Sequence, residues 1–320
     1  MLRRVGPSTY SWEHAIKTYD SPRAFRDALT QRAKQIAPRG NPSPVLRGFY
    51  FQRLLARLFQ ADPDGWLLKG GQALLVRFPA DARLSKDIDL QRVTTAAAAG
   101  REEAHAALLK AAAVDLGDFL SYVPGKTSDH GAETEGIDQT FTVYLGTTRV
   151  DTVHVDLVIR RNITAVPETV PLEPRPLLDW PLDWPMIKLY PLVDHVADKI
   201  CAIHEWRGTK PPSRFRDLAD VLLIGQRETL DAAACHHALH TEAALRRACG
   251  WPELRLPETF ELPHASWVSG YRTAVADVPG LDSCATWDAA FPQASAFITP
   301  LLGPAFTGTW DPRLRVWTTS

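Results

Sequence analysis

The fold of this chain is decided by residues 66–93, WLLKGGQALLVRFPADARLSKDIDLQRV. The run begins with a short apolar strand, WLLK, and a paired glycine that predicts a turn. A helix, QALLVRF, follows, and DIDLQRV starts a second strand near Asp87. The order strand, turn, helix, strand therefore brings a glycine turn and two acidic residues into one structural unit.

The two acidic residues of this run are predicted to share one face of a strand. Alternation within KDIDL sends Ile88 and Leu90 to the core face and Asp87 and Asp89 to the other. The two carboxylates then lie about 7 Å apart along the backbone. Their charges repel and raise each other's pKa unless a cation lies between them. Because Mg²⁺ prefers oxygen ligands, the pair predicts a site for Mg²⁺ (or Mn²⁺).

A third carboxylate comes from the later strand RVDTVHVDLVIR. Val155 and Leu157 point toward the core there, so Asp156 points the opposite way. Asp151 lies on the same strand, but Asp156 occupies its more apolar part, where an unpaired charge is costly without a ligand. We therefore expect Asp156 to complete the metal-binding set.

The glycine turn predicts a place for phosphate. Gly70 and Gly71 let backbone amides approach a ligand closely, and the N-terminus of the following helix adds partial positive charge. Three polar side chains flank the turn and are expected to bind nucleotide phosphates with it: Lys69, Arg83 and Ser85. Taken singly, the glycine pair could be a plain turn, the Asp87-x-Asp89 run a polar edge strand, and Asp156 a surface residue.

Two amphipathic helices precede this unit and carry positive charge. The first covers 21–37 behind a Ser21 cap, and the second covers roughly 45–60, with Arg47, Arg53 and Arg57 facing outward. Residues 1–60 hold 11 Lys/Arg against 3 Asp/Glu, although the whole chain has a net charge of −1. Such a region can bind phosphate groups. The alternative interpretation is an ordinary solvated helical surface.

The rest of the chain divides into a sheet-forming part and a helical part. An Ala-rich helix is expected over 100–116, followed by the strands FLSYV, IDQTFTVYL and RVDTVHVDLVIR. Residues 160–190 are rich in proline and form a long connection with short extended pieces such as MIKLY. The helical part then comprises VDHVADKICAIHEW, RFRDLADVLLI behind a Ser213 cap, and segments near 229–248, 265–278 and 285–302.

Composition places the chain among globular proteins. It has 320 residues, 45% hydrophobic and 23% charged, and no apolar run of the roughly 18 residues that a membrane span needs. We expect a soluble, cytoplasmic protein with no membrane contact. Its four cysteines form no CxxC pair, which argues against a disulfide framework or a zinc ribbon. In the run CHHALH at 235–240, a helix would spread the donor side chains over several faces, so no metal is expected there.

The glycine pair, the Asp87-x-Asp89 pair and the later Asp156 resemble the pattern of polymerase-beta-like nucleotidyltransferases, in which three strand carboxylates hold two metals around a nucleoside triphosphate. The closer likeness is to the AbiEii/AbiGii toxin family. The run LLKGGQALLVRF...RLSKDIDL resembles the first signature of that family. The resemblance spans roughly residues 20–225.

The same family carries a lysine on one helix and an Arg-Asp pair on the next, and ADKICAIHEW...RFRDLADVLL is similar. This implies catalytic roles for Lys199 and Asp217 beside Asp87 and Asp89, and nucleotide contacts for Arg214 and Arg216. Lys199 can neutralise triphosphate charge, and Asp217 can orient that lysine or act as a base. The alternative for Lys199 and Asp217 is a structural salt bridge between two helices.

The resemblance implies an α+β chain with a polymerase-beta-like nucleotidyltransferase core, a mixed sheet and a C-terminal helical domain. The expected regions are basic helices packing on the core, the sheet core, a proline-rich connection and the helical domain, at 1–62, 63–165, 166–190 and 191–320.

The expected activity is transfer of a nucleoside monophosphate from a nucleoside triphosphate to an acceptor hydroxyl. The resemblance implies that the acceptor is the 3′ end of a tRNA and that a cognate antitoxin opposes the protein. Two alternatives remain open: a transferase acting on a small molecule or a protein, and a protein that binds nucleotide without turnover.

Overall fold

A computed structural model describes residues 19–37, 40–93, 100–129, 136–159, 163–173, 176, 178, 182–250 and 252–318. The first 18 residues of the predicted basic region therefore lie outside the described residues, as do parts of the proline-rich connection. The helices are α1 (Pro22–Ile36), α2 (Ser43–Ala61), α3 (Gly70–Arg77), α4 (Arg101–Ala112), α5 (Leu192–Ile203), α6 (Phe215–Arg227), α7 (Ala232–Cys249), α8 (Trp267–Val275) and α9 (Trp287–Leu302), with the 3₁₀ helix η2 (Pro279–Cys284).

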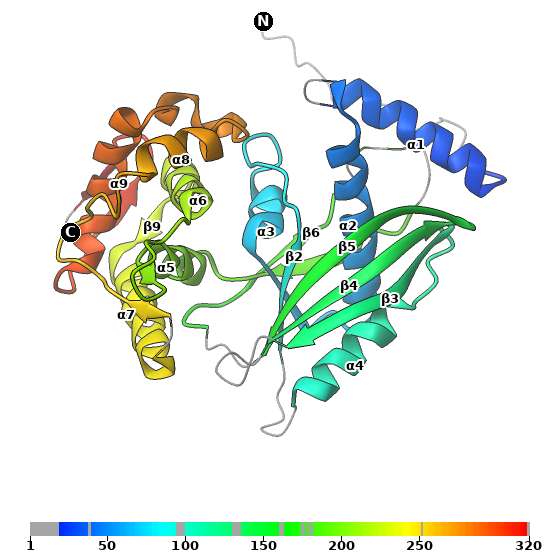
Figure 1. Ribbon diagram of the computed structural model, residues 1–320, viewed down its shortest axis with the longest axis horizontal. Coiled ribbons are helices and arrows are strands. Elements are labelled where there is room, and N and C mark those ends of the chain that lie inside the picture. Colours follow the sequence, from blue (N-terminus) through cyan, green and yellow to red (C-terminus); the bar gives the residue numbers. More distant parts are fainter. Residues whose placement is uncertain are drawn as a thin grey trace, which may run out of the picture.

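The central element is a seven-stranded mixed sheet in the order β3-β4-β5-β2-β1-β7-β6. Its strands are β1 (Trp66–Lys69), β2 (Ile88–Arg92), β3 (Leu120–Asp129), β4 (Gly136–Leu145), β5 (Thr148–Ile159), β6 (Glu168–Pro171) and β7 (Met186–Leu189). The pairs β2/β5 and β1/β7 are parallel, and the other neighbours are antiparallel. The predicted mixed sheet is confirmed, and it lies beside a separate helical half (Figure 1).

Local sequence signals set the helix boundaries in most places. Ser21 caps α1 as predicted, because its hydroxyl accepts a hydrogen bond from the Ala24 amide at 3.3 Å. The predicted Ser213 cap of α6 is wrong: the helix starts one residue later, with Arg214 at the N-cap and no side-chain cap. The amides of the α6 N-terminus are thus not satisfied by a serine hydroxyl.

The expectation that Arg53 and Arg57 face outward from α2 is wrong. Both side chains are fully buried and bind the buried carboxylate of Asp118, with nitrogen to oxygen distances of 2.6 Å for the ion pairs. The guanidinium of Arg53 also lies 4.7 Å from the ring centroid of Trp184, and that of Arg57 lies 4.9 Å from that of Tyr122. The charges hold α2 against the sheet and are not available to phosphate.

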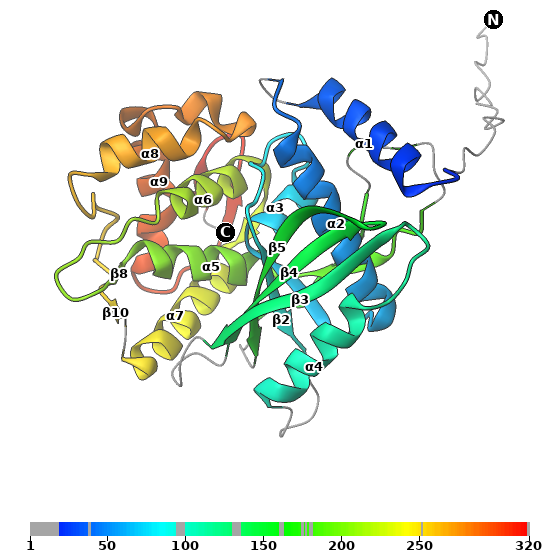
Figure 2. The same ribbon diagram turned by 45° about the vertical axis from the view of Figure 1, so that its right-hand side comes forward.

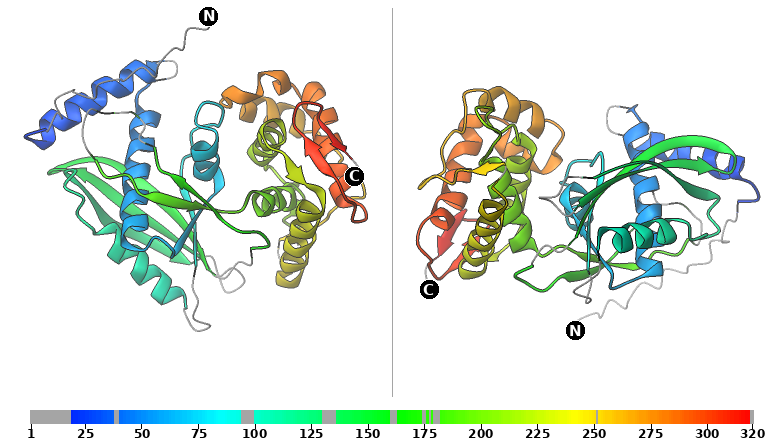
Figure 3. Two further views of the ribbon diagram at one scale, coloured as in Figure 1. Left: turned by 180° about the vertical axis from the view of Figure 1, so that it is seen from behind. Right: turned by 60° about the horizontal axis from the view of Figure 1, so that its bottom comes forward.

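Two hydrophobic cores divide the structure, and α3 belongs to both. One core joins α1, α2 and α4 to the buried face of the sheet, and Ala73 belongs to it. The other lies among α5 to α9, and Leu74, Leu75 and Phe78 pack into it. In Figure 3, α3 accordingly lies between the sheet and the helical half. The glycine turn is therefore fixed from both sides.

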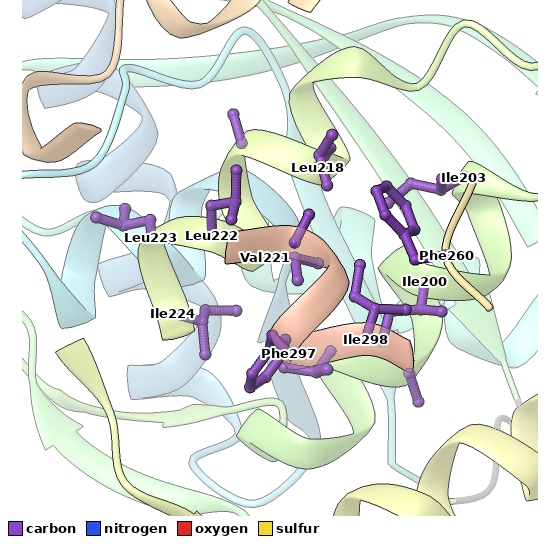
Figure 4. Close-up of a cluster of buried hydrophobic side chains, with 14 of the residues drawn as sticks. Ile200, Ile203, Leu218, Val221, Leu222, Leu223, Ile224, Phe260, Phe297 and Ile298 are labelled. Atoms are coloured by element: carbon purple, nitrogen blue, oxygen red, sulfur yellow. The ribbon is translucent and has the colours of Figure 1, made fainter. Parts of the chain in front are cut away.

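The C-terminal half is built around a helical core, part of which Figure 4 shows, and Ile200 of α5, Val221 of α6 and Phe297 of α9 belong to it. It also contains small sheets that sequence periodicity did not predict: β8 (Glu205–Trp206) with β10 (Glu253–Leu254), and β9 (Leu230–Asp231) with β11 (Thr309–Asp311) and β12 (Val316–Thr318). Among the described residues, no helix is long and apolar enough to cross a membrane.

Candidate active site

A row of charged residues crosses three adjacent strands of the central sheet. Lys69 at the end of β1 lies opposite Asp89 of β2 in the antiparallel register. Asp89 in turn lies beside Asp156 of β5 in the parallel register. Neighbouring strands are about 4.8 Å apart, so the two carboxylates that the sequence assigned to one metal site come from adjacent positions.

The alternation predicted for this strand holds. Ile88 and Leu90 are fully buried, whereas Asp89 is half-buried on the other face. Asp87 directly precedes β2 and is exposed. Its carboxylate accepts a hydrogen bond from the Ser85 hydroxyl at 3.1 Å, and its carbonyl accepts one from the same hydroxyl at 3.0 Å. Ser85 thus positions Asp87 in this structure.

Gly70 is required by both its conformation and its surroundings. Its φ of +60° lies in the left-handed region, and a Cβ at this position would lie 1.7 Å from Oδ2 of Asp89. Gly71 is also confined, since its Cβ would lie 3.0 Å from Oγ of Ser85 and 3.4 Å from Nη1 of Arg83. The glycine pair lets the start of α3 approach the acidic residues directly.

Asp89 has a strongly perturbed acidity. Burial, followed by the negative charges of Asp87 and Asp156, raises the pKa of Asp89 from 3.8 to about 7. The positive charges of Lys199 and Lys69 act in the opposite direction but do not cancel the shift. A carboxylate in this environment is stabilised in its charged form by a cation.

A second cluster of buried charges faces this row from the helical half. Lys199 of α5 donates to Asp217 at 2.9 Å and to Asp220 at 2.7 Å, both on α6. Asp220 also accepts two hydrogen bonds from Arg83, at 3.2 and 3.0 Å. Arg83 precedes β2, so Asp220 joins the loop that carries Asp87 to the helix that carries Lys199.

Electrostatics fix the charge states in this cluster. Burial alone would lower the pKa of Lys199, but Asp217 and Asp220 outweigh it and hold that pKa above its usual range. Burial alone would raise the pKa of Asp220, but Lys199 and Arg83 hold it below its usual range. Lys199 is therefore a permanent cation near the acidic row.

Lys69 is held by an aromatic ring at the end of its strand. It is 7% exposed, and its Nζ lies 4.2 Å from the centroid of the Tyr190 ring. Tyr190 follows β7, and its amide donates to the Leu68 carbonyl at 2.9 Å. The cation is thus stabilised next to Gly70 and Asp89.

Two predicted nucleotide contacts are not brought to the row. Arg214 and Arg216 are exposed at the start of α6, and within the described residues neither side chain forms a hydrogen bond or ion pair with the row.

The histidines of the run CHHALH at 235–240 lie against backbone carbonyls. The Nε2 atoms of His236 and His240 lie 3.0 and 3.2 Å from the carbonyl oxygens of Gly303 and Leu301.

Three residues near the site were missed as site residues by sequence reasoning. Asp138 of β4 lies opposite Asp156 in the antiparallel register and extends the row by one strand. A hairpin joins β4 to β5, so pairing the two strands about their turn could have found it. Asp220 follows Asp217 by one helical turn and received no role, because its binding of both Arg83 and Lys199 depends on long-range packing. Tyr190 carried no local signal.

The donor set of Asp87, Asp89 and Asp156 fits Mg²⁺ or Mn²⁺. All three offer carboxylate oxygens, and the pKa of Asp89 is raised by burial first and then by the negative charges of Asp87 and Asp156, so a bound cation would favour its charged form. In the described residues, no group of three His, Cys, Asp or Glu side chains is close enough to form a finished metal shell. To bind a metal, the three carboxylate side chains would have to converge.

Comparisons with known proteins identify the family of the chain. The family model described as "Nucleotidyl transferase AbiEii toxin, Type IV TA system" matches residues 53–291. No curated protein has a significant match to the chain. Among solved structures, the nucleotidyltransferase toxin MenT4 from Mycobacterium tuberculosis H37Rv is similar with a TM-score of 0.53 and 16% identity over 76% of each chain.

Two further structures are more distant. A putative nucleotidyltransferase from H. pylori has a TM-score of 0.41 and 12% identity, covering 81% of this chain and 94% of that one. A nucleotidyltransferase-like protein from Paracoccidioides brasiliensis has a TM-score of 0.37 and 15% identity, covering 65% and 94%. The fold class expected from the resemblance is confirmed by the MenT4 match and by the mixed sheet. The chain therefore belongs to the AbiEii family of nucleotidyltransferase toxins of type IV toxin-antitoxin systems.

Proposed function

We propose that this protein transfers a nucleoside monophosphate from a nucleoside triphosphate to an acceptor hydroxyl, and that the acceptor is the 3′ end of a tRNA. The observation that carries the proposal is the adjacency of Asp89 and Asp156 in neighbouring parallel strands, with Gly70 directly against Asp89. Mg²⁺ or Mn²⁺ held by Asp87, Asp89 and Asp156 would activate the acceptor hydroxyl and stabilise the leaving pyrophosphate.

The chain's own cations would bind the triphosphate. Gly70 and Gly71 begin α3, so their amides and the positive end of that helix face a ligand beside Asp89. Lys69 and Lys199 act electrostatically on Asp89 and so lie near the same point. Arg83 is held by Asp220, which supports its position beside Gly71 and leaves it a weaker candidate for direct phosphate binding.

In the reaction, the acceptor oxygen forms a bond to the α-phosphorus while the bond from that phosphorus to the bridging oxygen breaks. Pyrophosphate leaves with the electron pair. We assign the proton of the acceptor hydroxyl to Asp217, whose carboxylate is 18% exposed and is oriented by Lys199. Asp220 is more deeply buried and shared between two cations, so it fits a positioning role.

The choice of tRNA rests on the family and on surface charge. A cognate antitoxin and a cytoplasmic location follow from the same proposal, since the family is described as a toxin of type IV toxin-antitoxin systems. The burial of Arg53 and Arg57 removes two charges from the expected basic region, but Arg23, Arg32 and Lys34 remain exposed on α1.

The deciding experiment incubates the protein with each labelled nucleoside triphosphate, Mg²⁺ and total cellular RNA, and follows both label and pyrophosphate. Label on tRNA with Asp87→Ala inactive supports the proposal, and Asp282→Ala, which removes an exposed carboxylate in η2, serves as the matched control. Label on a small molecule or on a protein would show that tRNA is not the acceptor. Nucleotide binding without pyrophosphate release would show that the protein is not a nucleotidyltransferase.

A further inference from the structure

One face of the outer sheet, formed by β3, β4 and β5, is not covered by the helices that pack on these strands. Along β4, Ile137, Phe141 and Val143 are buried, whereas the alternating residues Asp138 and Tyr144 remain partly exposed. The two helices in closest contact with these strands, α2 and α4, share one hydrophobic core with the buried residues. Figures 1 and 2 show the strands in front of both helices.

The uncovered face is polar and continues directly from the acidic row. From Asp138 opposite Asp156, the next pairs along β4 and β5 are Thr140 with His154 and then Thr142 with Thr152. Thr140, Thr142 and Thr152 are half-buried and His154 is exposed. Hydroxyl and imidazole groups therefore line a path that begins at the proposed metal site.

The far end of this path is positively charged. The Arg149 guanidinium donates to the Thr152 hydroxyl at 3.2 Å, and Arg149 pairs with Tyr144 across the two strands. Arg26 of α1 donates to the Thr148 hydroxyl at 3.4 Å, but Thr148 pairs with the buried Leu145 and so belongs to the face that the helices cover. Arg149 and Asp156 are seven residues apart on one strand, which corresponds to about 23 Å. A polar path thus connects one guanidinium group to the carboxylates.

We propose that this open face of β3–β5 binds the unpaired 3′ end of the acceptor RNA. Its terminal hydroxyl would lie at the Asp156 end and its backbone phosphates would meet Arg149. The inference rests on the proposed function, whose acceptor it positions. Guanidinium groups suit phosphate, hydroxyl side chains suit ribose and base edges, and Tyr144 offers a ring on which a base stacks.

The first test is the salt dependence of RNA binding. The variant Arg149→Ala is expected to bind a 5′-labelled tRNA about fivefold more weakly, and the slope of log affinity against log salt should fall by about 0.7, the value for one lost contact to single-stranded RNA. The matched control, Arg313→Ala, removes one exposed guanidinium group from the C-terminal half and should bind as the wild type does. Equal affinity of the two variants would overturn the proposal.

A second test locates the contact on the RNA. Removing the unpaired 3′ nucleotides from the tRNA should weaken binding to the wild type but should weaken binding to Arg149→Ala less. Tyr144→Ala is expected to raise KM for the RNA about tenfold, whereas Tyr144→Phe keeps the ring and should have the KM of the wild type. KM for the nucleoside triphosphate should not change. Equal effects of the 3′ truncation on the wild type and on Arg149→Ala would place the RNA elsewhere.

The outcomes separate this inference from the proposed function. If the 3′ end binds this face but no nucleotide is transferred, the open face is retained as an RNA site and the proposed function fails. If nucleotide is transferred to tRNA by all variants with an unchanged KM for RNA, the proposed function stands and the open face is excluded. If Arg149→Ala and Tyr144→Ala weaken binding of a protein partner and leave RNA binding intact, the face is a protein interface and the inference is wrong.

Discussion

A Cβ added at Gly70 would lie 1.7 Å from Oδ2 of Asp89, so the glycine turn and the central carboxylate occupy one tightly packed point. Gly70 also has φ of +60°, where a side chain costs about 1–2 kcal/mol. The turn and the DxD motif are therefore coupled by direct contact as well as by sequence order.

We predict that Gly70→Ala lowers the transfer rate at least about 100-fold, because Asp89 has to move away from its metal-binding position. The matched control is Gly117→Ala: Gly117 has φ of +66° and no atom within 4 Å of its added Cβ. This variant should lose only the stability that the backbone strain costs and should keep its activity. Thermal unfolding and labelled-nucleotide transfer measure the two effects, and equal activity of both variants would contradict the coupling.

Asp89 is predicted to make the metal-free protein less stable as pH rises. Its pKa in the folded state is about 7 against an ordinary value of 3.8, so the folded state holds the proton more tightly. The free energy of unfolding should fall between about pH 4 and pH 7 and then level off.

Asp89→Asn should remove this pH dependence and stabilise the metal-free protein by about 1–3 kcal/mol at about pH 8, a figure reduced for the partial exposure of the side chain. Urea unfolding with a chelator measures this. Added Mg²⁺ should stabilise the wild type and not the variant. An unchanged pH dependence in the variant would show that another group titrates.

Asp217 and Asp220 are predicted to differ in role although both bind Lys199. Asp220→Ala leaves Lys199 and Arg83 buried without their shared carboxylate and should cost about 3–5 kcal/mol of stability. Asp217→Asn leaves the contact between Lys199 and Asp220 in place and should cost about 1 kcal/mol while abolishing transfer. Chemical unfolding and single-turnover transfer distinguish them. The assignment of the base fails if Asp217→Asn retains wild-type turnover.

The buried cluster around Asp118 is predicted to be structural. Asp118→Ala leaves Arg53 and Arg57 without a counter-charge and should cost about 3–5 kcal/mol. Arg47→Ala breaks a pair in which the arginine side chain is 42% exposed and should cost under about 1 kcal/mol. Denaturant midpoints measure both, and comparable losses would show that burial does not decide the difference.

The same cluster has a predictable pH response. Burial alone would raise the pKa of Asp118, but Arg57 and Arg53 hold it below its ordinary value of 3.8. The stabilisation is therefore fully present above about pH 4 and is lost as pH falls further. In acid titrations, wild type and Asp118→Asn should converge in stability below that pH, and a constant difference would contradict the linkage.

Only part of the site's arrangement could be predicted from local sequence patterns. The alternation of KDIDL fixed which face Asp89 takes, because side chains alternate strictly along a strand. The assignment of Asp156 over Asp151 agrees with the geometry: Asp156 lies beside Asp89, whereas Asp151 binds Arg47 at 3.1 Å. The roles of these residues in metal binding and catalysis remain predictions.

Periodicity and residues close together in the chain were enough to predict the elements around the glycine turn, the cap at Ser21 and membership of the family. The folded chain alone shows that Arg53 and Arg57 are buried on Asp118, that Asp220 joins Arg83 to Lys199, and that Asp138 extends the acidic row. These relationships depend on strand register and helix packing between distant segments, where a buried charge takes whatever counter-charge the fold brings to it.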